Sequence, residues 1–193
     1  MSPRPRSGDR FPLPPEIQPK EAGVLILLFP HENGLYFFLT RRTDMVETHK
    51  GQISLPGGSR EPGETLAQTA AREASEELGI ERACIQIIGD ALSPLFVPVS
   101  GFRITPFVGF TPARPNIAAS QHEVGEVIDT PLTVIVDETW IQEEENTFRG
   151  LPVMIPFYQV NGHKVWGATA MVLSEFGEML RQVKVQSEIY ETS

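Results

Sequence analysis

Residues 58–80 read GSREPGETLAQTAAREASEELGI, and this stretch decides the fold. Its part from Thr65 to Leu78 is rich in Ala, Leu, Gln and Glu and contains no Gly or Pro, so it predicts a helix. Gly79 follows and suits the left-handed residue just past a helix end. The small side chains on this helix are suited to close packing on a sheet, and they are Ala67, Ala70, Ala71 and Ala74.

Three glutamates near the end of this helix form a predicted charge cluster. Positions three and four apart lie on one helix face, so we expect Glu73, Glu76 and Glu77 to project together. Like charges at this spacing repel each other unless a cation lies among them. Mg²⁺ takes carboxylate and carbonyl oxygens together with substrate phosphates. A solvated acidic face is the alternative, but the glycines and the arginine at fixed offsets favour a metal site.

The stretch resembles the signature of a known family. The pattern G-x5-E-x7-R-E-U-x-E-E-x-G-U, with U an apolar residue, is the Nudix box, and residues 58–80 match every fixed position. The resemblance implies an α/β fold, the Nudix α/β/α sandwich with a mixed central sheet and a catalytic loop-helix-loop. It also implies a pyrophosphohydrolase that cleaves nucleoside diphosphate derivatives with Mg²⁺ or Mn²⁺.

The resemblance assigns roles to individual residues of the box. The metal ligands are expected to be Glu73, Glu76, Glu77 and the backbone carbonyl of Gly58, with Glu64 as a further ligand or a partner of the ligands. Arg72 is expected to be structural, since a guanidinium among carboxylates can hold one of them in its fork.

A further catalytic glutamate is expected after the box. In many Nudix enzymes such a residue reaches the metal cluster as general base. Glu123 is the prediction because it begins a strand after a long polar loop, and Glu126 is the alternative. The two fall on opposite faces of a strand. His122 is more often an exposed loop histidine than a phosphate donor.

The segment before the box points to a substrate. Residues 38–58, FLTRRTDMVETHKGQISLPGG, resemble the signature L-L-T-x-R-[SA]-x3-R-x3-G-x3-F-P-G-G of the coenzyme A pyrophosphatase branch. The matching positions are Leu39, Thr40, Arg42, Gly51, Pro56, Gly57 and Gly58. The departures are Phe38, Thr43, Glu47 and Leu55, of which Glu47 reverses a charge.

Cationic groups in this segment are the candidate substrate contacts. Arg42, His49 and Lys50 lie beside the predicted metal site in an otherwise acidic chain, so we expect them to meet substrate phosphates. A polar loop between two strands is the alternative reading of Thr40 to Lys50. The favoured function is therefore a coenzyme A diphosphatase. Hydrolysis of another diphosphate, such as ADP-ribose, a dinucleotide or an oxidised nucleotide, is the second hypothesis, and a non-catalytic nucleotide sensor is the third.

Composition bounds the other functions. The chain has 193 residues, 40% apolar and 21% charged, which excludes a disordered chain. Its net charge of −9 argues against a nucleic-acid binder, which needs a basic surface. No apolar run approaches the roughly 20 residues of a membrane span, and no secretory signal is recognised, so we expect a cytoplasmic protein with a small-molecule substrate. The oligomeric state stays open, with a homodimer as one option.

Residues 1–20 are expected to form a Pro-rich arm without fixed structure, and residues 21–193 a single domain. Alternating apolar patterns and turn signals predict strands at 23–29, 35–40, 52–55, 83–92, 103–110, 123–128 and 152–159, and a closing helix at 168–183. Residues 93–102 are expected to be a loop, and residues 133–142 stay open between strand and helix.

Three further features have an expected place. The single cysteine, Cys84, is expected to be a buried structural thiol. Trp166, in a segment that resembles the start of the last helix of the same branch, is expected in the core. The acidic run Glu143–Glu145 is expected on an exposed loop or helix end.

Overall fold

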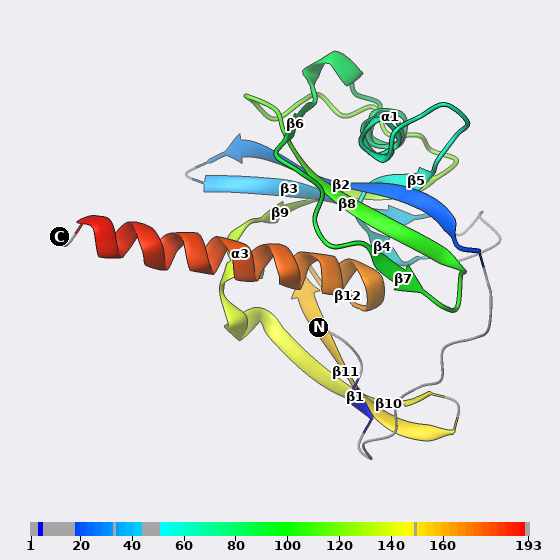
Figure 1. Cartoon of the computed structure of the whole chain (residues 1–193), viewed down its shortest axis with the longest axis vertical. Helices are drawn as coiled ribbons and strands as arrows, with labels where there is room; N and C mark the ends of the chain where they lie inside the picture. Colours follow the sequence, from blue (N-terminus) through cyan, green and yellow to red (C-terminus); the bar gives the residue numbers. More distant parts are fainter. Residues whose placement is uncertain (1–3, 6–17, 33, 44–50, 149, 192–193) are drawn as a thin grey trace. The chain divides into compact units, whose positions relative to one another are not determined.

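The computed structural model describes residues 4–5, 18–32, 34–43, 51–148 and 150–191 (Figure 1). Contacts divide the chain into two compact units, Arg10–Pro131 and Met1–Asp9 with Leu132–Ser193. That residues 21–193 form a single domain remains a prediction, which this division into compact units does not test. Within the described residues, no helix has the length and apolar character that a membrane crossing requires.

The larger unit is built on a mixed eight-stranded sheet. Its elements are β2 (Lys20–His31), β3 (Gly34–Arg42), β4 (Ile53–Ser54), β5 (Gly57–Ser59), α1 (Leu66–Leu78), η1 (Arg82–Cys84), β6 (Gln86–Ile88), β7 (Leu95–Val97), β8 (Phe102–Phe110) and β9 (Val124–Pro131). The main path runs β4-β3-β2-β8-β6, and β5, β7 and β9 pair with β2, β8 and β3. Strands β2 and β8 are parallel, whereas β2 and β3, which cover the predicted strands 23–29 and 35–40, form an antiparallel hairpin. The sheet is therefore mixed, as expected.

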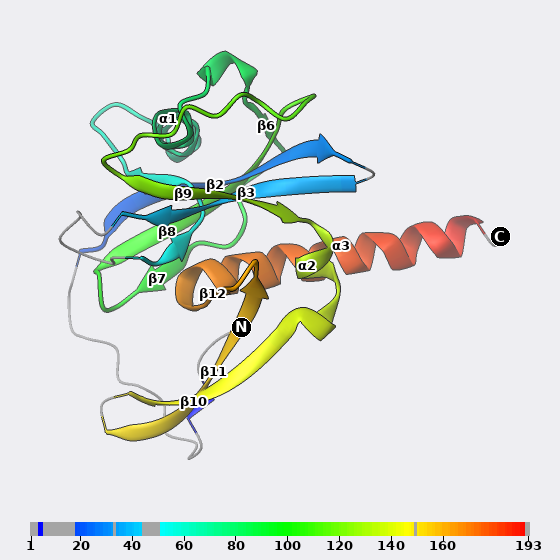
Figure 2. The same ribbon diagram turned by 180° about the vertical axis from the view of Figure 1, so that it is seen from behind.

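Helix α1 lies across one face of this sheet (Figure 1). Viewed from behind, β9 runs beside β3, with which it pairs antiparallel (Figure 2). The alternate residues Leu25, Leu27 and Phe29 of β2 are fully buried and cluster with Ala70 and Ala74 of the helix. Their alternation follows from the two-residue period of a strand. This apolar contact positions the acidic end of the helix over the sheet.

The smaller unit contains β1 (Arg4–Pro5), α2 (Thr133–Val136), η2 (Glu138–Trp140), β10 (Ile141–Phe148), β11 (Leu151–Val160), β12 (His163–Val165) and α3 (Gly167–Glu191). Strand β11 pairs antiparallel with β1, β10 and β12. In α3, Val172, Leu173 and Phe176 are buried. Because α3 runs from Gly167 to Glu191, the closing helix is longer than the predicted 168–183.

Several local predictions are wrong. Cys84 is exposed, because the chain turns through η1 before the strand begins at Gln86. Leu95–Val97, in the predicted loop, forms a strand because it pairs with Phe102–Ile104. Trp166 is 45% exposed and is not a core residue.

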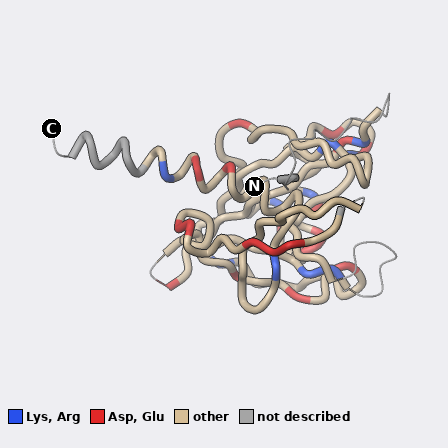
Figure 3. The backbone as a smooth tube through the Cα atoms, turned by 90° about the horizontal axis from the view of Figure 1, so that it is seen from below, with Lys and Arg blue, Asp and Glu red and all other residues tan. Residues whose placement is uncertain are grey.

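The acidic run Glu143–Glu145 also lies elsewhere than predicted. It belongs to strand β10, where it pairs with Met154–Pro156 of β11. Figure 3 colours acidic residues such as these red along the backbone. Lys164 of β12 forms an ion pair with Glu144 of this run. Both strands that carry this ion pair are paired with β11.

The close approach of α1 to β2 requires a glycine at position 23. A β-carbon there would lie 2.5 Å from the carbonyl oxygen of Leu66 and 2.9 Å from the backbone nitrogen of Ala70. We predict that Gly23→Ala lowers the free energy of unfolding by about 1–3 kcal/mol, the usual cost of overpacking. Chemical denaturation measures the loss. Gly34→Ala is the matched control, since a β-carbon there meets no atom within 4 Å. Equal stability of the two variants would contradict the close approach.

Candidate active site

Helix α1 is fixed at both ends. At its start, the Thr65 side chain accepts from the backbone N–H of Gln68, whose side chain accepts from the N–H of Thr65, a complete capping box. At its end, Gly79 adopts the left-handed conformation with φ 64°, as the sequence predicts. Both ends being fixed, the carboxylates of the last two turns have a defined position over the sheet.

The glycine segment of β5 lies against these carboxylates. A β-carbon on Gly58 would overlap the carboxylate of Glu73. The backbone N–H of Gly57 hydrogen-bonds the carboxyl of Glu77. The predicted site residues Gly58, Glu73 and Glu77 are therefore brought together, and the absence of a side chain at Gly58 makes the approach possible.

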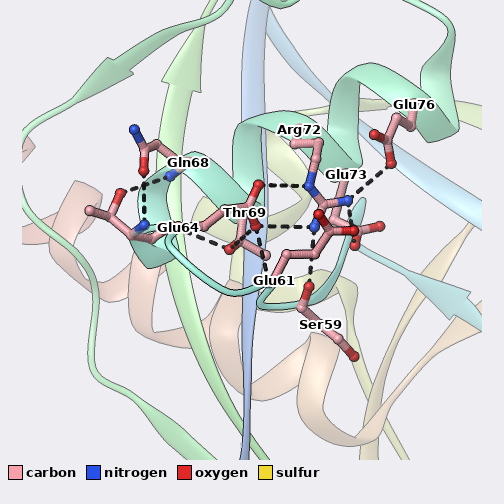
Figure 4. Close-up of polar contacts among 9 residues, drawn as sticks. Ser59, Glu61, Glu64, Gln68, Thr69, Arg72, Glu73 and Glu76 are labelled. Atoms are coloured by element: carbon pink, nitrogen blue, oxygen red, sulfur yellow. Dashed lines mark hydrogen bonds and ion pairs between the residues drawn. The ribbon is translucent and has the colours of Figure 1, made fainter.

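Arg72 connects the box residues through five donated hydrogen bonds (Figure 4). Its Nε lies 2.8 Å from Oε1 of Glu64, and its Nη1 lies 3.0 Å from both Glu73 Oε1 and Glu76 Oε2. Its Nη2 donates to the carbonyl of Ser59 at 3.1 Å. One guanidinium thus holds three carboxylates and the glycine segment, which is the arrangement that a structural role requires.

Glu64 is saturated by protein donors. Besides the Arg72 guanidinium, Thr69 Oγ1 and the backbone N–H of Glu61 donate to Oε2 of Glu64, at 2.9 and 3.2 Å. The hydrogen bond from Arg72 is the main reason that the pKa of Glu64 falls to about 2. Of the two predicted roles, this geometry favours a partner of the ligands over a direct metal ligand.

Thr69 and the Ser59 carbonyl were missed by sequence reasoning. Thr69 is fully buried on the alanine side of the helix, and its hydroxyl bonds Glu64 and the Thr65 carbonyl. A lone hydroxyl four residues after the helix cap, among alanines, is the signal that marks it. The Ser59 carbonyl carries no sequence signal, since any residue supplies one.

Glu77 lies at the centre of the acidic cluster. Its residue exposure is 9%, and Oε2 is buried without a hydrogen-bond partner among the described residues. Burial, followed by the charge of Glu73, raises the pKa of Glu77 to about 8, while nearby Arg42 opposes the rise. Burial also raises the pKa of Glu73, against the opposing charge of Arg72. Without a cation, the site therefore disfavours the ionised form of Glu77.

Two residues outside the box reach this cluster. The charge of Glu123 contributes to the raised pKa of both Glu73 and Glu77, so the predicted general base lies within electrostatic range of the ligands. Arg42, at the end of β3, lies within electrostatic range of Glu77 and has a buried Nε without a hydrogen-bond partner in the described residues. The alternative base, Glu126, instead forms an ion pair with Arg41 at 3.2 Å.

The cluster fits a divalent cation in its chemistry. As the side chains lie, no three His, Cys, Asp or Glu residues in the described ranges form a ready metal-binding group. However, the buried oxygen of Glu77 lacks a partner, and neighbouring carboxylates disfavour its ionisation. Hard carboxylate and carbonyl oxygens are the donors that Mg²⁺ and Mn²⁺ take. The residues that would hold the ion are Gly58, Glu73, Glu76 and Glu77. The predicted substrate contacts His49 and Lys50, and the departure Glu47, lie outside the described residues.

The fold and site define an α/β protein that carries a carboxylate-rich loop-helix-loop on a mixed sheet. The family model of the NUDIX domain matches residues 19–149. The chain therefore belongs to the Nudix hydrolase family, as its box predicts, and its fold is the Nudix α/β sandwich.

Individual relatives agree with this assignment. The chain is 31% identical over 181 residues to Nudix hydrolase 15, mitochondrial, of Arabidopsis thaliana, which covers 90% of this chain and 61% of the plant protein. It is 32% identical over 177 residues to the uncharacterized Nudix hydrolase NudL of Pectobacterium atrosepticum, covering 84% and 86% of the two chains. The Nudix hydrolase RenU of M. Smegmatis superposes with a TM-score of 0.57 at 18% identity over 86% of each chain, which shows the fold alone.

The Arg72 network predicts an effect of replacing its guanidinium. Arg72→Lys keeps the charge but removes the planar fork, so Glu64, Glu73 and Glu76 can no longer be held by one group. We expect a loss of about 2 kcal/mol in the free energy of unfolding and a lower rate of diphosphate hydrolysis. Denaturation and an activity assay measure both effects.

Arg114→Lys is the matched control for this variant. It breaks another fork, in which Nε and Nη2 of Arg114 lie 2.5 and 3.1 Å from Asp129. This control should leave hydrolysis intact, because no residue of the acidic cluster is involved. Full activity and stability of Arg72→Lys would contradict the connecting role.

The disfavoured ionisation of Glu77 predicts stabilisation by metal, because a bound cation favours the carboxylate form. A ligand at 100 times its Kd stabilises the folded state by about 2.7 kcal/mol, so saturating Mg²⁺ should raise the Tm of the wild type by several degrees. Glu77→Gln removes a ligand charge and should shrink that rise to less than half. Thermal unfolding with and without Mg²⁺ measures it. Glu81→Gln, at an exposed glutamate just after the helix, should respond like the wild type; an undiminished rise in Glu77→Gln would remove Glu77 from the ligand set.

Proposed function

We propose that this chain hydrolyses the pyrophosphate bond of coenzyme A or an acyl-coenzyme A, releasing 3′,5′-ADP and 4′-phosphopantetheine, with Mg²⁺ or Mn²⁺ as cofactor. The observation that carries the hydrolytic part is the buried oxygen of Glu77, which has no hydrogen-bond partner in the described residues and lies among like charges. Such a group costs free energy unless a cation compensates it.

The chain's own residues supply the remaining parts of the reaction. Divalent ions, when bound, would offset negative charge on the phosphoryl oxygens and ease ionisation of water. Glu73, Glu76 and Glu77 would hold them, and Arg72 keeps two of these carboxylates in place. Glu123 would take the proton as the water oxygen bonds to phosphorus, while the electron pair of the broken anhydride P–O bond leaves with the departing phosphate oxygen.

Arg42 supports the phosphate-binding part of the proposal. It occupies the arginine position of the coenzyme A pyrophosphatase signature, and its guanidinium lies near Glu77 at the cluster. Its Nε is buried without a partner in the described residues, so a donor is left for an anionic ligand. Guanidinium groups bind phosphate through paired hydrogen bonds.

The coenzyme A part of the proposal rests on residues 38–58. Their agreement with the branch signature includes the Thr40–Arg42 segment of β3 and the Pro56–Gly58 segment at the cluster. His49 and Lys50 are proposed to contact the 3′-phosphate, which distinguishes coenzyme A from ADP-ribose.

A substrate panel tests the proposed reaction. Coenzyme A, acetyl-coenzyme A, ADP-ribose, diadenosine polyphosphates and an oxidised nucleotide are incubated at one enzyme concentration, and product masses are recorded. Activity should vanish in EDTA and return with Mg²⁺ or Mn²⁺. Activity that survives the chelator rules out the metal-dependent reaction. Faster cleavage of ADP-ribose or a dinucleotide transfers the function to that substrate, and binding without turnover indicates a nucleotide sensor.

A comparison of two closely related substrates tests the 3′-phosphate contact. Coenzyme A should show a kcat/KM roughly ten-fold to a hundred-fold higher than its 3′-dephospho form, the preference expected from one charge-assisted contact. Lys50→Ala should reduce that ratio while sparing the dephospho form, and steady-state kinetics on both substrates measures it. Equal kcat/KM values on the two forms would refute the contact. Arg82→Ala, at a cation just beyond the box, is the control and should keep the preference.

A further inference from the structure

The predicted general base, Glu123, lies in a turn formed by residues 118–124, the 118–124 turn, which is anchored from two sides. The backbone N–H groups of Glu123 and Val124 both donate to the carbonyl of Ser120, at 3.0 and 2.8 Å, which closes the turn. Glu123 is part of the closed turn, so the position of its carboxylate depends on where the turn is held.

One anchor is the end of helix α1. The N–H of Ala118 donates to the carbonyl of Leu78 at 3.0 Å, and the N–H of Ser120 donates to the carbonyl of Glu77 at 3.1 Å. These carbonyls are among the last of the helix and have no partner within it. A β-carbon on Gly79 would overlap the carbonyl of Ala118, which shows how closely the turn approaches. The turn is therefore attached to the very residue, Glu77, that lies at the centre of the cluster.

The second anchor is Thr43, just after β3. Its backbone N–H donates to the carbonyl of Glu123 at 3.1 Å, and its hydroxyl donates to the carbonyl of His122 at 3.0 Å. Thr43 is 7% exposed, so water does not readily replace these hydrogen bonds. The pairing of β3 with β9 shifts register between Arg41 and Arg42 and ends with Arg42 opposite Val124, so the hydrogen bonds of Thr43 extend this ladder into the turn.

We propose that Thr43 is a positioning residue: its hydroxyl and backbone N–H hold the 118–124 turn so that Glu123 faces Glu73 and Glu77. This inference rests on the proposed function for its catalytic consequence. Thr43 takes no part in the chemistry and acts only through Glu123. The raised pKa of Glu73 and Glu77, to which the Glu123 charge contributes, agrees with this placement.

Replacement of the hydroxyl tests the proposal. Thr43→Val removes one donor and keeps the side-chain shape, and Thr43→Ser keeps the donor. We expect Thr43→Val to lower kcat roughly ten-fold with little change in KM, because a small misplacement of a reacting group costs rate more than binding. Thr43→Ser should restore most of the loss. Equal kcat values for the Val and Ser variants would overturn the role of the hydroxyl.

Thr130→Val is the matched control. Thr130 is a buried threonine at the far end of β9, and its hydroxyl also donates to a backbone carbonyl, that of Ile128 at 3.3 Å. This variant should keep its kcat whatever its effect on Tm. If Thr130→Val lost as much kcat as Thr43→Val, the loss would reflect general destabilisation, and the positioning role would be overturned.

A double variant separates positioning from general structure. If Thr43 acts through Glu123, then Thr43→Val should lower kcat little further in a Glu123→Gln background. Full additivity of the two losses would overturn the proposal.

Amide hydrogen exchange gives a readout that does not depend on activity. Exchange at Glu123 and Val124 should accelerate in Thr43→Val and stay at the wild-type rate in Thr130→Val. Unchanged exchange in Thr43→Val would overturn the proposal. If the wild type cleaves no diphosphate, the proposed function fails, while exchange still decides whether Thr43 holds the turn.

Discussion

The packing of α1 on β2 positions both halves of the acidic site. Gly23 lets the helix backbone approach the strand, and Ala70 and Ala74 keep the interface thin. The same strand pairs with β5, where Gly58 lies opposite Gly23. One strand therefore positions both the helix that carries the carboxylates and the glycine segment that faces them. A larger side chain at this point would separate the two parts of the site.

The carboxylates of the site are not equally stabilised by the surrounding protein. Arg72 donates hydrogen bonds to Glu64, Glu73 and Glu76, whereas Glu77 receives a backbone hydrogen bond from Gly57 and the charge of Arg42, which do not outweigh its burial. Glu64, Glu73 and Glu76 thus have a cationic partner in the protein itself, whereas Glu77 gains most from a bound cation. Groups that hydrogen-bond to metal ligands commonly fix the orientation of those ligands in this way. A bound cation would relieve the repulsion that Glu73 and Glu123 exert on an ionised Glu77.

The sequence predicts the parts whose signals are local. The helix, its terminal Gly79 and the two strands β2 and β3 follow from composition and turn residues over short stretches. Cys84 and Trp166 were misplaced because exposure depends on neighbours distant in the chain. The Glu143–Glu145 run was misplaced because β-pairing can outweigh the low strand propensity of glutamate. In the site, the box glutamates follow from spacing, whereas the Ser59 carbonyl and the anchors of the 118–124 turn are visible only after folding.

The order of the strands has a consequence for how the site is assembled during folding. The β2–β3 hairpin and α1 lie close together in sequence, whereas β2 pairs with β8, and β3 with β9, across long stretches of chain. Contacts between distant segments form more slowly than local ones, since closing a long loop costs entropy. We therefore expect the glutamates of α1 to pack on the sheet before β9 pairs with β3 and brings Glu123 to them. Pairing of β9 is then the step that completes the active site.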